Sequence, residues 1–107
     1  MAPHNRNFKH LLLWLIAGSR GGVNRGKIIQ ALREEPLNAN QLRNLLGVDY
    51  RTIRHHLEVL EKNGVITSMG ERYGKMYFLS QELEEYYGDF EEIWVRIGNK
   101  SKNGHSE

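Results

Sequence analysis

The most informative polar side chains lie close together in the stretch VDYRTIRHHLEVLEKNG, which begins at Val48. On a helical wheel, Arg51 and His55 point away from the apolar positions, and Thr52 and Arg54 flank them. Arginine can donate two parallel hydrogen bonds to guanine O6 and N7, and a single helix fits the DNA major groove. These side chains therefore predict recognition of base edges in double-stranded DNA.

The helix that positions them is predicted over residues 49–63. Asp49 is a suitable N-cap, and an Asn-Gly pair follows the last helical residue. Ile53, Leu57 and Leu60 recur at helical spacing and form the face opposite the arginines. The helix is therefore expected to be apolar behind and cationic in front.

A shorter helix precedes it. Asn38 and Gln41 have the spacing of a capping box, and Gly47 can adopt the left-handed conformation of a tight turn. The apolar stripe of this helix consists of Leu42, Leu45 and Leu46. Because Gln41 and Tyr50 lie near helix starts, we expect them to help hold phosphates.

A β-hairpin is predicted next. Residues 65–69 and 75–79 have strand composition, and the turn between them has a glycine at each end, with Arg72 and Lys75 at or beside its tip. Two helices and a basic-tipped hairpin predict a winged helix-turn-helix fold, mainly α with a small β-hairpin wing (α+β). The wing, about 65–79, would contact the flanking backbone or minor groove.

The string LGVDYRTIRHHLEVLEKNGVI, within residues 25–80, resembles the ArsR-like winged helix-turn-helix transcriptional regulators, especially their archaeal branch. The resemblance implies a DNA-binding regulator. Relatives often have Ser-Arg where this chain has Arg54-His55, so operator preference does not carry over. Metal-sensing members use cysteine pairs, or His and carboxylate pairs on the last helix. This chain has no cysteine and no histidine there, so we expect no metal and no cofactor.

Composition fits one small domain of 107 residues without disulfides, which is consistent with a cytoplasmic protein. The net charge of +2 is unevenly spread: residues 1–80 contain twelve Lys or Arg and six Asp or Glu, whereas residues 81–97 contain one and six. The acidic last helix is therefore expected to face away from nucleic acid.

Apolar stripes at both chain ends predict a dimer interface. The stripe of the last helix either covers the domain's own core or forms a dimer seam, and we favour the seam because aromatic residues are enriched at association surfaces. The predicted interface residues are Leu12, Trp14, Leu15, Leu83, Tyr87, Phe90, Ile93, Trp94 and Ile97. Residues 1–6 would be a flexible N-terminus, 7–97 the winged domain with its dimerisation helices, and 98–107 a disordered tail.

The apolar run FKHLLLWLIA, residues 8–17, has a basic start and small residues after it, as secretory signals do. It is too short to span a bilayer, which takes about 20 apolar residues. A buried helix shared between two subunits is favoured, with no membrane association.

Residues 21–27, GGVNRGK, match the G-x-x-x-x-G-K loop of nucleotide hydrolases, but Ile28 stands where Ser or Thr would bind magnesium. A glycine-rich linker into a helix capped by Asn24 is preferred. That helix would stop before Pro36, and Arg25 and Lys27 at its start could touch a phosphate.

The adjacent His55 and His56 diverge by about 100° on a helix, so they do not share a metal ion easily. We expect His56 to be half-buried and bonded to backbone, and His55 to point outward. Protonation of His55 would then strengthen phosphate binding at mildly acid pH. No catalytic constellation is recognised, so the chain is not expected to be an enzyme.

These features predict a homodimeric, sequence-specific DNA-binding transcriptional regulator. The alternative is a winged-helix protein-interaction module of a transcription complex with little DNA specificity of its own. That module would bind free DNA weakly and be a monomer.

Overall fold

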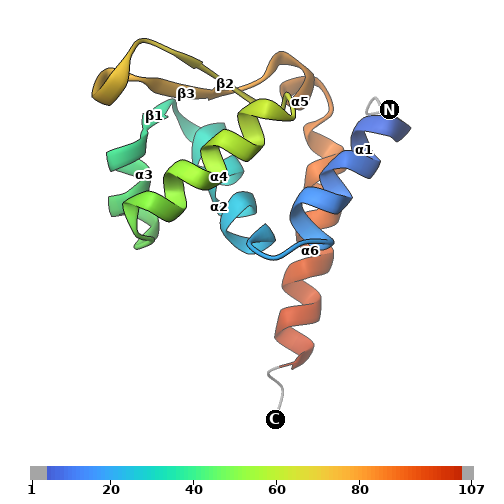
Figure 1. Ribbon diagram of the computed structural model, residues 1–107. Coiled ribbons are helices and arrows are strands. Elements are labelled where there is room, and N and C mark those ends of the chain that lie inside the picture. The colour runs from blue at the N-terminus through green and yellow to red at the C-terminus, as the bar shows by residue number, and fades with distance from the viewer. Residues whose placement is uncertain (1–4, 105–107) are drawn as a thin grey trace.

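The computed structural model describes residues 5–104, together with their side chains except at position 73 and from 99 to 104. Figure 1 shows the arrangement of the elements. In chain order they are α1 (Arg6–Leu12), the π-helical turn η1 (Leu13–Ala17), α2 (Gly22–Glu34), β1 (Leu37–Asn38), α3 (Ala39–Leu46), α4 (Tyr50–Lys62), β2 (Ile66–Met69), the 3-10 turn η2 (Arg72–Gly74), β3 (Met76–Leu79), α5 (Gln81–Glu85) and α6 (Tyr87–Gly104).

The helix-turn-helix unit is formed by local signals, and its capping is confirmed. The Asn38 side chain accepts from the Gln41 N–H at 2.8 Å, and the Gln41 side chain accepts from the Asn38 N–H at 2.8 Å. Gly47 ends α3 in the left-handed region with φ of 68°. Asp49 then accepts hydrogen bonds from the first amides of α4.

The apolar faces of α3 and α4 are buried to different extents. Ile53, Leu57 and Leu60 of α4 are fully or almost fully buried, as predicted. On α3, Leu42 is buried but Leu45 is 63% exposed, so the predicted leucine stripe is wrong at that position. The helix is short, and only one side of it meets the core.

The wing is part of a three-stranded antiparallel sheet with strand order β1-β3-β2. β2 and β3 form the predicted hairpin, with Ile66 opposite Leu79. The sequence did not predict β1, in which Leu37 pairs with Tyr77. This two-residue strand directly follows Pro36, and it connects α2 to the sheet before α3 begins.

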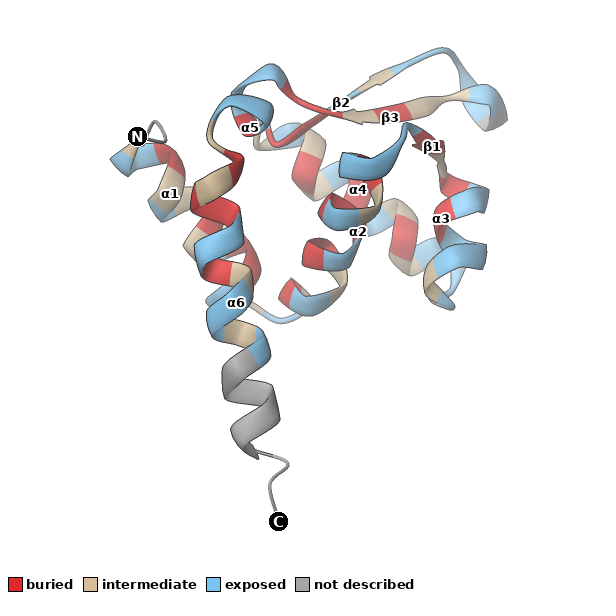
Figure 2. Cartoon of the chain, turned by 180° about the vertical axis from the view of Figure 1, so that it is seen from behind, coloured by how far each residue is buried: buried red, intermediate tan, exposed pale blue. Residues whose placement is uncertain are grey.

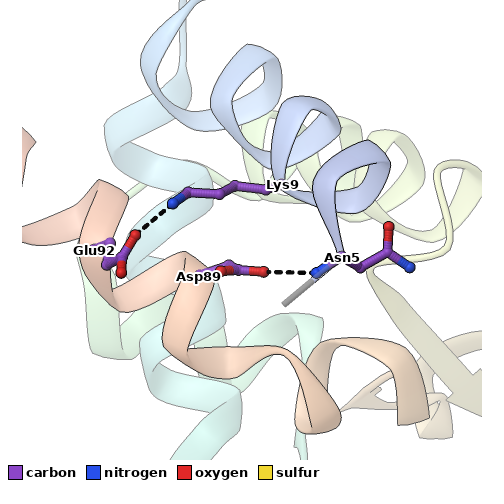
Figure 3. A network of polar contacts seen from close by, with 4 residues as sticks. All are labelled: Asn5, Lys9, Asp89 and Glu92. Atoms are coloured by element: carbon purple, nitrogen blue, oxygen red, sulfur yellow. Dashed lines mark hydrogen bonds and ion pairs between the residues drawn. The ribbon is translucent and has the colours of Figure 1, made fainter. Parts of the chain in front are cut away.

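The helices at the two ends of the chain, α1 and α6, lie side by side, on the opposite side of the molecule from α3 and the hairpin tip (Figure 1). Polar contacts between them are drawn in Figure 3. The Asn5 N–H donates to Asp89 Oδ2 at 3.5 Å, and Lys9 forms an ion pair with Glu92. The basic start of the chain is thus attached to the acidic last helix within one protomer.

Figure 2 shows how far the residues of each helix and strand are buried. The core joins side chains from the terminal helices, α2, α3, α4 and the sheet into one cluster. Gly26 of α2 is part of the contact with α6, because a Cβ placed there would lie only 2.1 Å from Trp94 Cζ3. Because Gly26 has no side chain, the Trp94 indole can occupy this space.

Several predicted boundaries differ from the structure. Asn24 does not cap α2; the helix begins two residues earlier, after Gly21 with φ of 87°. The last helix is divided at Tyr86 into α5, which Ser80 caps, and α6. α6 continues to Gly104, where the sequence predicted a disordered tail from position 98; positions 105–107 lie outside the described residues. At the other end α1 begins at Arg6, and the remainder of the predicted flexible segment, residues 1–4, lies outside them too.

Within residues 5–104, no helix is long and apolar enough to cross a membrane.

Candidate nucleic-acid interface

The outer face of α4 has the composition that the sequence indicated. Arg51 and His55 are exposed, one helical turn apart, and the buried side of the helix contacts the core. A helix held from behind in this way can present both side chains to a groove without unfolding. Of the candidates for base contacts, these two are the most accessible.

The start of α4 is fixed by Asp49. Its carboxylate accepts from the Arg51 N–H at 3.1 Å and from the Thr52 N–H at 3.3 Å, and the Thr52 hydroxyl donates to it as well. These hydrogen bonds, that of the Thr52 hydroxyl most of all, lower the pKa of the Asp49 carboxyl. Thr52 is half-buried. Because its hydroxyl donates a hydrogen bond to Asp49, the hydroxyl oxygen can only accept a hydrogen bond from a base.

Arg54 lies on a different side of α4, facing the sheet. Burial raises the pKa of the Tyr77 hydroxyl on β3, and the positive charge of Arg54 opposes that rise. Glu61, two turns further along α4, accepts from the Ser68 hydroxyl of β2 at 2.6 Å. The half-buried Arg54 therefore lies near enough to β3 for its charge to act on Tyr77.

The hairpin tip has two cations in different surroundings. Arg72 is exposed and has φ of 52°, a left-handed conformation that is unusual for any residue but glycine and that forms the tight end of the hairpin. Lys75 is half-buried, with its Nζ 5.9 Å from the centre of the Tyr77 ring. Met69, beside them, is 70% exposed and was not singled out from the sequence.

The two predicted phosphate contacts near the helix starts are both accessible in part. Tyr50 is half-buried, and Gln41 is exposed. Because Gln41 Oε1 accepts the Asn38 N–H in the capping box, its NH₂ group is the part that can donate to a phosphate.

Arg25 is almost completely buried, so the prediction that it could contact a phosphate is wrong. The residue is 4% exposed, and its guanidinium donates to the Leu15 carbonyl and to His56 Nδ1. His56 is buried, and its partner is this arginine and not the backbone that the sequence suggested. Burial lowers the pKa of the His56 imidazole, and the charge of Arg25 lowers it further.

Lys27 is exposed, but residues 22–34 form a continuous helix. The G-x-x-x-x-G-K match thus falls largely inside α2, whose backbone amides cannot form a phosphate loop. Within the described part of the chain, no group of three His, Asp or Glu residues has the geometry of a metal site.

The predicted interface residues divide into two classes. Trp14 is 58% exposed, and Trp94 and Ile97 are half-buried. The others lie in the protomer's own core, at 9% exposure or less: Leu12, Leu15, Leu83, Tyr87, Phe90 and Ile93. Val95, which is 59% exposed on α6, was missed because it falls outside the apolar stripe. A groove of about 710 Å³ runs beside α6, lined by Trp94, Val95 and Gln30 among others.

Comparison with known proteins agrees with this geometry. Residues 24–68 match a family model described as a helix-turn-helix domain. This stretch of the chain is therefore similar to a helix-turn-helix domain. No protein of curated function matches the sequence significantly.

Solved structures extend this likeness to the whole winged fold. The transcriptional regulator HlyU from Vibrio vulnificus superposes with a TM-score of 0.60 at 19% identity, over 87% of this chain and 88% of that one. MarR from Staphylococcus aureus, solved with salicylate and kanamycin, gives 0.64 at 14% identity over 95% and 71%. A transcriptional regulator from Thermotoga maritima gives 0.61 at 17% identity over 95% and 78%. The fold is that of a winged helix-turn-helix protein, as the sequence predicted.

Proposed function

We propose that this chain is a sequence-specific DNA-binding transcriptional regulator, similar to the archaeal ArsR-like proteins, that acts as a homodimer in the cytoplasm and is not an enzyme. The observation that carries the proposal is the two-sided character of α4. Its apolar side is buried in the core, while Arg51 and His55 are exposed on the other side, at the second helix of a helix-turn-helix domain.

In the proposed complex α4 lies in the major groove. Arg51 and His55 contact base edges directly, and Arg54 reaches the groove edge on the side of the wing. Thr52 contributes an acceptor near the start of the helix. These contacts would supply sequence preference.

The remaining contacts would hold the backbone and supply affinity. Tyr50 and the Gln41 amide bind phosphates beside the groove. Arg72 and Lys75 bring the wing to the flanking backbone or minor groove, since cations dominate such contacts.

The homodimer would form through the terminal helices, which lie opposite the hairpin tip (Figure 1). Trp14, Trp94 and Ile97 keep accessible apolar surface there, and Val95 extends it. The predicted interface residues buried in the core would support these helices from beneath. Two recognition helices would then meet half-sites about 34 Å apart, or a multiple of that spacing.

The test is binding of the purified chain to genomic fragments selected for affinity, compared with shuffled fragments over a range of salt concentrations. Arg51→Ala should weaken binding to the selected fragment by about 10- to 150-fold and leave binding to shuffled DNA nearly unchanged. Arg51→Lys keeps the charge but not the paired donors. It should therefore keep the salt dependence and lose most of the discrimination.

Arg20→Ala, in the turn before α2, is the matched control, because it removes the same charge from an exposed position that belongs to neither the proposed DNA contacts nor the proposed dimer residues. It should leave selectivity unchanged. If Arg51→Ala retains full selectivity, α4 does not read bases in the way proposed. A monomer in light scattering with little affinity for DNA at low salt would instead point to a protein-interaction module.

A further inference from the structure

A guanidinium and an imidazole meet inside the protein, beneath the recognition helix. Arg25 comes from α2 and His56 from α4, and they are 4% and 5% exposed. Arg25 Nη1 lies 3.2 Å from His56 Nδ1. Such contacts are uncommon because a buried cation is normally paired with a carboxylate.

Arg25 joins α4 to the segment that follows the N-terminal helix. Its Nε donates to the Leu15 carbonyl of η1 at 2.9 Å, and its Nη2 donates to the Arg20 carbonyl at 3.1 Å and to the Ser19 hydroxyl. One side chain thus holds η1, the turn before α2 and the recognition helix together. All the groups it contacts there are neutral.

The contact depends on the protonation state of His56. A guanidinium can only donate, so His56 Nδ1 must accept, and the single ring proton lies on Nε2. A second proton on Nδ1 would remove the acceptor and place two cations in contact. Gly21 adjoins both groups, because a Cβ built there would lie 2.6 Å from His56 Cε1 and 3.4 Å from Arg25 Nη1.

The charges that act on His56 have the same sign. They are Arg25 from α2 and His55 from α4 itself, and both add to the effect of burial in lowering the pKa of His56. The imidazole is therefore neutral at neutral pH, and it gains its second proton only under acid conditions.

We propose that the Arg25–His56 contact is a pH-sensitive latch, which fixes α4 on α2 and η1 while His56 is neutral and frees it when His56 is protonated. The inference rests on the proposed function, since its effect would be on DNA binding. The terminal helices next to η1 form the proposed dimer surface, so the latch would set how the two recognition helices are presented. Freeing α4 lowers affinity for DNA, whereas protonation of His55 would raise it.

The test compares the full-length chain with His56→Gln, using the genomic fragment selected above, between pH 8 and pH 5. Glutamine can still accept from Arg25 but does not titrate, and both proteins keep His55. The ratio of their affinities should be constant above pH 7. In acid the wild type should lose affinity relative to the variant, by at most about tenfold per pH unit for one proton.

A constant ratio down to pH 5 overturns the latch. So does a loss of affinity that coincides with loss of helical circular dichroism, because whole-chain unfolding would then explain it. The second measurement needs no DNA: the His56 ring signals in NMR should titrate below about 6.5, the ordinary histidine value. Amide signals of Ser19, Arg20 and α4 should move with the same midpoint.

The NMR measurement uses the wild type, so it decides the question even if His56→Gln does not fold. A His56 titration without any response in α4 overturns the latch. A coupled response in a chain that binds no DNA at any pH would support the latch and refute the proposed function.

Discussion

Replacing Gly26 by alanine should destabilise the protein, although alanine is the better helix former. Gly26 is buried within α2, against the indole of Trp94. A Cβ at this position would lie 2.1, 2.6 and 2.7 Å from three ring atoms of Trp94, far inside normal contact distance. The indole is also stacked on Phe90, with ring centres 5.7 Å apart, so moving it away loses that contact too.

Two opposing effects determine the size of the change. Alanine in place of glycine within a helix gains about 1 kcal/mol. Overpacking a fitted contact costs about 1–3 kcal/mol, and the three short distances favour the upper end of that range. The free energy of unfolding should therefore fall by about 2 kcal/mol. For a chain of this size, the melting temperature should fall by about 10 °C.

Urea denaturation of the wild type, Gly26→Ala, Trp94→Ala and the double variant measures the coupling directly. All four must be compared at one protein concentration, because self-association would add to stability. Once the indole is absent, Gly26→Ala should stabilise the chain by up to about 1 kcal/mol. An effect of the same sign in both backgrounds would refute the packing argument.

Other perturbations have equally definite outcomes. Asn38→Ala removes the acceptor of the capping box and should lower the free energy of unfolding by about 1 kcal/mol in urea; a negligible change would mean that the cap adds no stability. Burial raises the pKa of Tyr77 and Tyr87, so the unfolded chain loses these protons first. The free energy of unfolding should fall as pH rises past about 10, and replacing both tyrosines by phenylalanine should abolish that loss. Trp14→Ala should shift the mass measured by light scattering toward the monomer, whereas Val23→Ala, a similarly exposed apolar position on α2, should not. Equal shifts would place the interface elsewhere.

The parts of the fold that sequence predicted well depend on interactions within a few residues. The capping box at Asn38, the turn at Gly47 and the cap at Asp49 were all correct, because each involves neighbours at most four positions away. β1 was missed for the opposite reason. Leu37 has no local strand pattern, and it is extended because it pairs with Tyr77, forty positions further along.

The candidate functional residues also divide into those set by local sequence and those set by distant parts of the chain. Helical periodicity placed Arg51 and His55 on the outer face of α4, since the wheel depends only on the backbone of that helix. It placed Arg54 beside that face but could not give its burial, because the half-buried position of Arg54 depends on where the sheet lies. Arg25 was expected at the surface because the side chain that meets it in the core, His56, lies 31 positions further along the chain.

The sequence by itself determined which helix can face DNA, because the order of polar and apolar residues along α4 leaves only one side for the core. Tertiary structure decided what the other apolar stripes do. It buried Leu12 and Phe90 within the chain's own core and left Trp14 exposed, although all three belong to the apolar stripes at the chain ends. The reason is that burial is set by contacts between distant segments, here α1 and η1 against α6, and periodicity gives the apolar face of a helix without the surface that covers it.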